Sequence, residues 1–229
     1  ASVFAGFRER FGVTINEVGL KKEQRTLADW LSKRGYRTGA FVSGWPLVDQ
    51  VIKLGPRFHT YGDDLREVKI LPPHAHEIGL LRILERMLVA RDFEQRVQDR
   101  RAELTANEAI QWLERAPKTP FFLWVHFYDP HLPYQPLDRF VDRATKAYTG
   151  PADGRWYTID AEQKRQIIRD PASLLHMNAL YDAEIAHADE QLGLLVASAK
   201  KTAPNGLMIV VTADHGEAFG EHDMYWGRD

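Results

Sequence analysis

The fold class of this 229-residue chain is decided by the stretch Leu207-Met208-Ile209-Val210-Val211-Thr212-Ala213-Asp214-His215-Gly216-Glu217. Residues 207–212 are apolar, largely β-branched and preceded by a turn-forming Asn-Gly pair, which predicts a short buried strand. A carboxylate and an imidazole, Asp214 and His215, follow directly after it. In α/β proteins, ligands bind outside the carboxyl ends of the strands. The stretch therefore predicts a ligand site at the edge of an α/β sheet.

Helical and strand patterns alternate along the chain before this stretch. A capping box at Thr26 and Asp29 begins a predicted helix that ends near Gly35. The other predicted elements are a strand over 36–43, helices within 78–115, a strand over 121–128 and a helix over 174–199. Helices that alternate with buried strands indicate a three-layer α/β/α sandwich with a mixed, mostly parallel sheet. Because the chain starts at Ala1 and stops at Asp229, soon after the quoted stretch and with no closing element, we expect an internal fragment whose sandwich is incomplete at both ends.

The predicted helices differ in how clearly they show a buried face. The helix over 174–199 has the clearest apolar face, formed by Leu180, Ile185, Ala188, Leu192 and Leu195. The segment 78–115 is amphipathic and nearly neutral, which favours a solvated helix pair over a coiled-coil surface. Thr105 and Glu108 predict a capping box within it. Residues 129–172 predict a long loop region with a short helix near 160–169.

The composition excludes some classes of protein and leaves the compartment open. The formal net charge of −2 gives no general attraction to nucleic acid or to an anionic membrane. No apolar run approaches the roughly 20 residues that span a bilayer. The chain has no cysteine, so no disulfide can form within it.

Asp214 and His215 are the strongest candidates for metal ligands. A carboxylate oxygen suits hard cations such as calcium, whereas an imidazole nitrogen suits manganese or zinc better. The alternative is an Asp-Gly type turn that contains a hydrogen-bonded histidine. A second polar cluster, Glu217 to His222, follows within a few residues and favours a functional site.

Four stretches in this order resemble the sulfatase family of the alkaline phosphatase superfamily. Residues 1–6 and 10–13 resemble the segment after the sulfatase nucleophile signature. Residues 26–43 resemble the next helix and strand, and 120–131 resemble the strand before a substrate-binding histidine. The stretch 207–222 resembles the C-terminal metal motif. The resemblance implies the alkaline phosphatase-like α/β/α fold and the hydrolysis of a sulfate ester.

The resemblance also implies a set of site residues and cofactors. Asp214 and His215 correspond to metal ligands, and the usual metal of the family is calcium, with manganese or zinc as alternatives. His131 corresponds to the histidine that contacts the sulfate and can protonate the leaving oxygen. His222 and Arg228 correspond to substrate-binding positions. The nucleophile, a formylglycine, is expected upstream of Ala1, and the partner is a small-molecule or glycan sulfate ester.

The resemblance leaves the activity of the parent protein open in two ways. Residues 1–229 are expected to be part of one sulfatase catalytic domain that is inactive alone. The compartment of the parent is unknown from these residues, and the resemblance implies a secreted or periplasmic protein. The segment 43–47 lacks the Lys and His that common sulfatases carry after this strand. One alternative is therefore a phosphodiesterase, phosphonate hydrolase or phosphoethanolamine transferase of the same superfamily. The other is a catalytically inactive scaffold or interaction protein.

Overall fold

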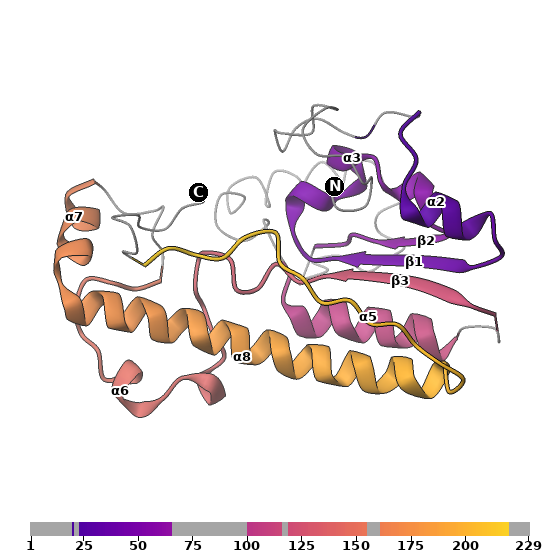
Figure 1. The fold of residues 1–229 in the computed structure, drawn as a ribbon. Helices are drawn as coiled ribbons and strands as arrows, with labels where there is room; N and C mark the ends of the chain where they lie inside the picture. The colour runs from indigo at the N-terminus through magenta and orange to yellow at the C-terminus, as the bar shows by residue number, and fades with distance from the viewer. Residues whose placement is uncertain (1–19, 21–22, 66–99, 116–118, 155–160, 220–229) are drawn as a thin grey trace, which may run out of the picture. The chain divides into compact units, whose positions relative to one another are not determined.

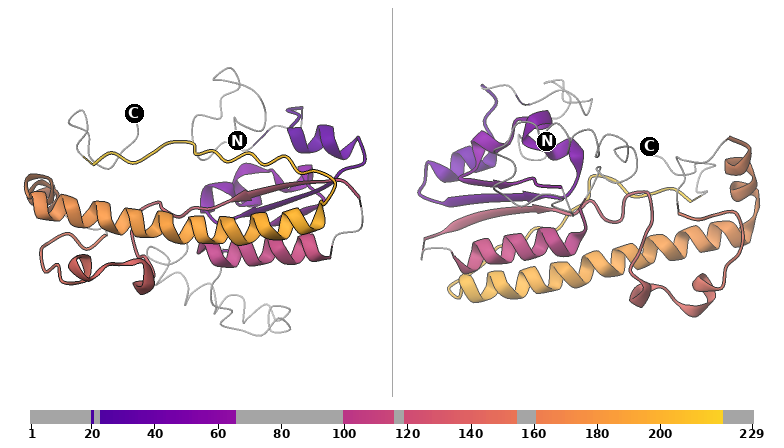
Figure 2. Two further views of the ribbon diagram at one scale, coloured as in Figure 1. Left: turned by 60° about the horizontal axis from the view of Figure 1, so that its bottom comes forward. Right: turned by 180° about the vertical axis from the view of Figure 1, so that it is seen from behind.

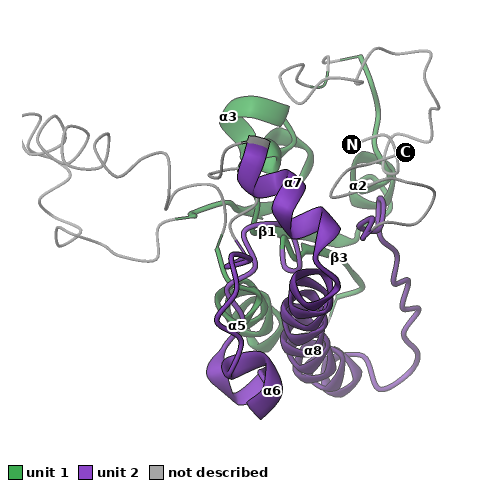
Figure 3. Cartoon of the chain, turned by 90° about the vertical axis from the view of Figure 1, so that its left-hand side faces the viewer, with its two compact units in different colours: residues 1–128 green, residues 129–229 purple. Residues whose placement is uncertain are grey.

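The computed structural model divides the chain into two compact units, residues 1–128 and residues 129–229, which are treated separately (Figure 3). The residues that the structure describes are 20, 23–65, 100–115, 119–154 and 161–219. Four predictions lie outside the described residues. They concern the segment 1–13, the helical pattern over 78–99, His222 and Arg228.

The first unit contains a parallel sheet of three strands in the order β2-β1-β3 (Figure 1). The central strand pairs through Gly39 with Thr60 on one side and Leu123 on the other. The strands are β1 (Arg37–Val42), β2 (Thr60–Gly62) and β3 (Phe121–His126). The predicted strands over 36–43 and 121–128 are confirmed. Strand β2 was not predicted, because three residues are too few to show a period.

Helices α2 (Leu27–Ser32) and α5 (Ala102–Glu114) cover opposite faces of this sheet (Figures 1 and 2). Side chains along β1 alternate between the two faces. Ala40 lies in the core cluster that includes Ala28 of α2, whereas the ring of Phe41 packs against Trp112 of α5, with centroids 6.3 Å apart. The three-layer arrangement is thus confirmed. The connection from β1 to β2 holds the short helices η1 (Trp45–Leu47), α3 (Asp49–Ile52) and η2 (Gly55–Arg57).

One of the two predicted capping boxes is confirmed. The Thr26 hydroxyl accepts from the Asp29 amide at 3.3 Å, and the Asp29 carboxylate accepts from the Thr26 amide at 2.8 Å. The capping box predicted at Thr105 is wrong, because α5 begins at Ala102 and Thr105 lies inside it. The Thr105 hydroxyl instead accepts from Nε of the buried Arg100 at 3.0 Å.

Arg100 ties together the carboxyl ends of the strands. Its guanidinium donates to the carbonyl oxygens of Val42 at 3.1 Å and Asp64 at 3.1 Å. The Glu108 carboxylate, 2.7 Å away, supplies the opposite charge. A buried guanidinium is stable only when its donors are satisfied, so this network fixes the edge of the sheet that lies toward Ser43.

The second unit is built around a 32-residue helix, α8 (Pro171–Thr202). Asp170 caps it by accepting from the Ser173 amide at 3.0 Å, and Pro171 occupies the first helical position. This helix and α7 (Ala161–Arg169) confirm the helices predicted over 174–199 and near 160–169. The shorter elements η4 (Asp138–Phe140) and α6 (Arg143–Lys146) also contact α8. The core consists of Leu132, Tyr134, Ala152, Ile167, Met177 and Leu180.

The buried face of α8 differs from the predicted one. Ile185 was expected to be buried but is 41% exposed. The face runs instead through apolar and polar residues at intervals of three and four, namely Met177, Leu180, Glu184, His187, Gln191 and Leu195. The prediction considered only apolar residues, so it left out Glu184, His187 and Gln191. For this reason the predicted face included Ile185.

The predicted strand over 207–212 is wrong for the described structure. The segment is extended and returns along α8, but it joins no strand among the described residues (Figures 1 and 2). Met208, Val210 and Val211 are 89%, 79% and 68% exposed, respectively. Apolar β-branched residues favour a strand only where neighbouring strands bury them. The segment has the composition of a buried strand, but no strand among the described residues lies beside it to bury its side chains.

None of the described helices is long and apolar enough to cross a membrane.

Candidate functional site

His131 lies in a segment that we call loop 129–135, which begins the second unit. The Asp129–Pro130 and Leu132–Pro133 peptide bonds of this loop are both cis. His131 is partly buried, and its Nδ1 lies 2.7 Å from the carbonyl oxygen of Leu132. A carbonyl oxygen can only accept, so this contact places a hydrogen on Nδ1. Nε2 is then the ring nitrogen that can exchange a proton with a substrate.

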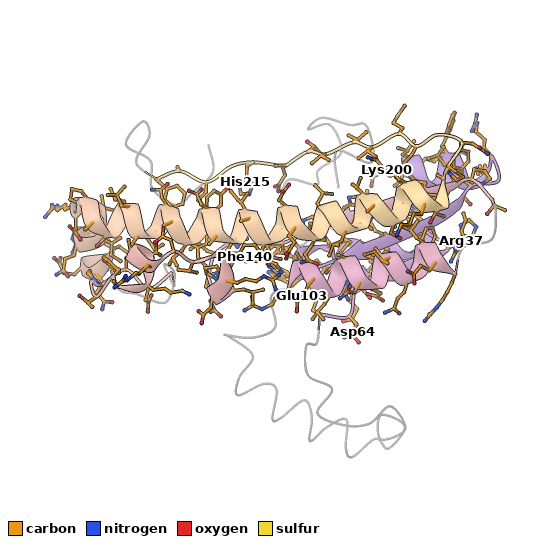
Figure 4. The ribbon with its side chains drawn as sticks, turned by 90° about the horizontal axis from the view of Figure 1, so that it is seen from below. Arg37, Asp64, Glu103, Phe140, Lys200 and His215 are labelled. Carbon is orange, nitrogen blue, oxygen red and sulfur yellow. The ribbon has the colours of Figure 1, made fainter. Side chains whose placement is uncertain are left out.

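Asp214 and His215 lie in the extended segment after α8, where Figure 4 labels His215. The His215 amide donates to Asp214 Oδ1 at 3.1 Å, and Asp214 Oδ2 lies 3.8 Å from His215 Nε2. The Asp214 side chain is 81% exposed and that of His215 is 30% exposed. One carboxylate oxygen and one ring nitrogen are therefore adjacent and open to a ligand. This arrangement can supply two neighbouring ligands to a cation.

A hydrogen bond joins loop 129–135 to the segment that carries these two residues. The buried hydroxyl of Tyr134 donates to Glu217 Oε2 at 3.1 Å. The Tyr134 ring also packs near Phe219, with centroids 6.2 Å apart, and near Tyr181. Burial raises the pKa of the Tyr134 phenol above its usual range, and the charge and hydrogen bond of Glu217 raise it further. The phenol therefore remains a donor at all ordinary pH values.

A cluster of two carboxylates and one imidazole lies at the base of loop 129–135. One ligand-type atom from each of Asp129, Glu184 and His187 lies within 4.8 Å of the others. Glu184 is 5% exposed and His187 is fully buried. Glu184 Oε1 accepts from the backbone amide of Gln135 at 2.8 Å, and Asp129 Oδ1 lies 3.8 Å from His187 Nδ1. Groups of this kind could hold a metal ion or act as a polar anchor.

Among the described residues, the structure thus places His131 in one segment of the second unit, and Asp214 and His215 in another. Tyr134 and Glu217 connect the segment of His131 with the segment of Asp214 and His215. That these three side chains share one cleft remains a prediction. Glu184 and His187 were not predicted as site residues, although two ionisable residues three apart in the same helix as Met177 and Leu180 were a usable signal.

A family model matches the whole chain. The family model described as Sulfatase matches residues 1–229. An arylsulfatase of Clostridium perfringens (strain 13 / Type A) is 30% identical over 129 residues, which are 52% of this chain and 27% of that protein. The chain therefore spans only part of the length of this relative.

Solved structures of two hydrolases resemble the fold. The phosphonate monoester hydrolase of Agrobacterium radiobacter matches with a TM-score of 0.58 at 19% identity, over 100% of this chain and 54% of that one. The phosphonate monoester hydrolase SpPMH from Silicibacter pomeroyi matches with a TM-score of 0.54 at 18% identity, over 99% of this chain and 54% of that one. At these identities the likeness concerns the fold alone.

Proposed function

Because this chain belongs to the sulfatase family, we propose that the full-length protein hydrolyses a sulfate ester with the help of a bound divalent metal ion. The observation that carries the proposal is the family match over residues 1–229, which includes His131, Asp214 and His215. We further propose that residues 1–229 form part of one catalytic domain.

Asp214 and His215 are the proposed metal ligands in this chain. Two atoms bound to one ion at about 2.1–2.4 Å lie roughly 3–4.8 Å apart, depending on the angle between them. The 3.8 Å between Asp214 Oδ2 and His215 Nε2 fits this range. Calcium is the first candidate by family, and the imidazole also suits manganese or zinc. The bound ion would supply positive charge beside the sulfate and the nucleophile.

His131 is the proposed proton donor to the leaving oxygen. Its Nδ1 faces the Leu132 carbonyl at 2.7 Å, and this contact supports Nε2 as the nitrogen that transfers the proton. In the general-acid role the imidazolium carries a second hydrogen on Nε2. When the S–O bond breaks, the Nε2 proton neutralises the departing alkoxide or phenoxide. The proposed role of loop 129–135 is therefore to hold His131 Nε2 in a fixed position.

The remaining parts of the proposed site come from residues outside the described ones. Arg228 offers a planar fork of donors that suits a tetrahedral oxyanion, and His222 is proposed to bind the same group. The nucleophile is proposed to be a formylglycine, and the substrate is proposed to be a small-molecule or glycan sulfate ester. None of the described residues selects one such ester.

The proposal is tested by aryl sulfate turnover in the full-length protein and in His131→Ala. General acid catalysis typically contributes about a hundredfold to ten-thousandfold, so kcat should fall by at least about a hundredfold. Metal content should not change, because His131 is not a proposed ligand. His176→Gln is the control, since His176 is not a proposed site residue; it lies in α8 and stacks on Tyr148 with ring centroids 4.0 Å apart.

Three results would contradict the proposal in different ways. Wild-type turnover in His131→Ala would show that His131 is not the proton donor. Hydrolysis of an aryl phosphonate or phosphodiester without any hydrolysis of aryl sulfate would assign the protein to another activity of the superfamily. No turnover of any of these esters by metal-loaded protein would favour the inactive scaffold.

A further inference from the structure

We propose that Glu184 is a positioning residue for His131, which it serves by holding loop 129–135 on helix α8. The inference rests on the proposed function, because it assigns a purpose to the position of His131. It concerns the cluster of Asp129, Glu184 and His187, which the metal motif does not include.

Both ends of the loop contact the same turn of α8. Glu184 and His187 are three residues apart and share one helix face. At the far end of the loop, the Gln135 amide donates to Glu184 Oε1 at 2.8 Å. At the near end, Asp129 Oδ1 lies 3.8 Å from His187 Nδ1. His131 lies between these two contacts, so the helix determines where its ring can go.

The surroundings of the cluster favour a rigid anchor. The Glu184 side chain is only 5% exposed, and a hydrogen bond from a backbone amide to a buried carboxylate is stronger than one between neutral groups. The ring of Phe140, labelled in Figure 4, packs against His187 with centroids 5.7 Å apart. Tyr134, between the two contacts, is itself 1% exposed. Each of these features restricts the movement of the loop.

A metal ion is the competing explanation of the same three residues. Two carboxylates and one imidazole within 4.8 Å could ligate zinc or manganese. The described contacts favour the anchor, because Glu184 Oε1 already accepts from the Gln135 amide. An oxygen that holds the loop in this way does not require a cation to explain its burial.

The proposal requires two measurements on the full-length protein and on Glu184→Ala, Glu184→Gln and Glu190→Ala. The first is hydrogen exchange over residues 129–135 without substrate, and the second is kcat and KM for an aryl sulfate. Glutamine keeps an acceptor oxygen for the Gln135 amide, whereas alanine removes it. Glu190 is the matched control, because it lies on the same helix, its side chain is 45% exposed, and its ion-pair partner Arg139 lies outside residues 129–135.

Glu184→Ala should speed exchange at Gln135 and lower kcat by about tenfold to a hundredfold, as expected for a displaced catalytic group. KM should change much less, because proton transfer matters most in the transition state. Glu184→Gln should restore slow exchange and most of kcat, and Glu190→Ala should match the wild type in both. A role limited to overall stability would not produce this split between kcat and KM or the rescue by glutamine.

The outcomes that would overturn the inference differ from those that would overturn the proposed function. An active enzyme in which Glu184→Ala keeps wild-type exchange and kcat would refute the anchor. The anchor would also be refuted if the wild type held one equivalent of zinc or manganese that is lost in Glu184→Ala and kept in Asp214→Ala. The Glu184 carboxylate would then be a metal ligand. A wild-type protein without aryl sulfate turnover would refute the proposed function, and the exchange measurement would still decide whether Glu184 holds the loop.

Discussion

Replacing Tyr134 with phenylalanine should remove the hydrogen bond that joins loop 129–135 to the segment of the proposed metal ligands. Tyr134 is 1% exposed, and its hydroxyl donates to Glu217 Oε2 at 3.1 Å. Phenylalanine keeps the ring packed near Tyr181 and Phe219, so the change removes the hydroxyl and leaves the apolar packing in place.

The magnitude follows from the charge and the exposure of the acceptor. A hydrogen bond to a charged group contributes about 1.5–3 kcal/mol to stability. Glu217 is only partly buried, so water can replace part of the lost donor. We therefore expect the free energy of unfolding to fall by about 1–2 kcal/mol. Urea unfolding of the full-length protein near pH 8 measures this value. Tyr36→Phe is the control, because the Tyr36 hydroxyl makes no hydrogen bond among the described residues.

The difference between the two proteins should also depend on pH in a defined direction. The folded-state pKa of Tyr134 is raised above its unfolded value, which is about 10. The stability from this group is therefore fully present below about pH 10 and is lost as the pH rises above it. The advantage of the wild type over Tyr134→Phe should shrink between pH 8 and pH 11. Equal urea midpoints, or a difference that does not change with pH, would refute the reasoning.

Three further predictions concern packing and the exposed segment. Gly39→Ala should lower the free energy of unfolding by about 1–3 kcal/mol, because a Cβ there would lie 2.8 Å from ring atoms of Trp112. Gly193→Ala should raise the free energy of unfolding by about 0.5–1 kcal/mol, because a Cβ in this helix would meet nothing within 4 Å. Urea unfolding measures both values. Val210→Lys should change the free energy of unfolding by less than about 0.5 kcal/mol, because Val210 is 79% exposed, and a urea midpoint that falls by the equivalent of about 2 kcal/mol or more would contradict this. Residues 1–229 expressed alone should aggregate, because Met208, Val210 and Val211 are exposed; a monodisperse protein with a cooperative unfolding transition would contradict this.

Local signals were enough to predict helices α2 and α5 and strands β1 and β3 of the first unit, and the long helix of the second. The capping box at Thr26 and the apolar run of β1 depend on residues close together in the chain, and both are confirmed. The strand β2 could not be predicted, because its three residues pair only through contacts with a distant strand. The segment 207–212 shows the opposite error, since strand composition alone does not supply the neighbour that a strand requires.

The site residues that lie close together in the sequence could be predicted from motifs. Those that are far apart in the sequence and meet only in the folded protein could not. Asp214, His215 and His131 stand in recognisable motifs. Glu184 is separated from Gln135 by 49 residues, and no local pattern connects them. The contact between Tyr134 and Glu217 joins positions 83 residues apart. Such contacts depend on how α8 and the two segments pack, and this packing is a property of the whole unit.

The central claim is tested most directly by metal content and aryl sulfate turnover in the full-length protein and in Asp214→Ala. Asp189→Ala, which removes an exposed carboxylate from α8, is the matched control. We expect Asp214→Ala to lose its bound divalent metal and its turnover together, because a charged ligand beside the reacting sulfate is lost, and Asp189→Ala to keep both. Wild-type metal content and turnover in Asp214→Ala would show that Asp214 is not a ligand of a catalytic metal.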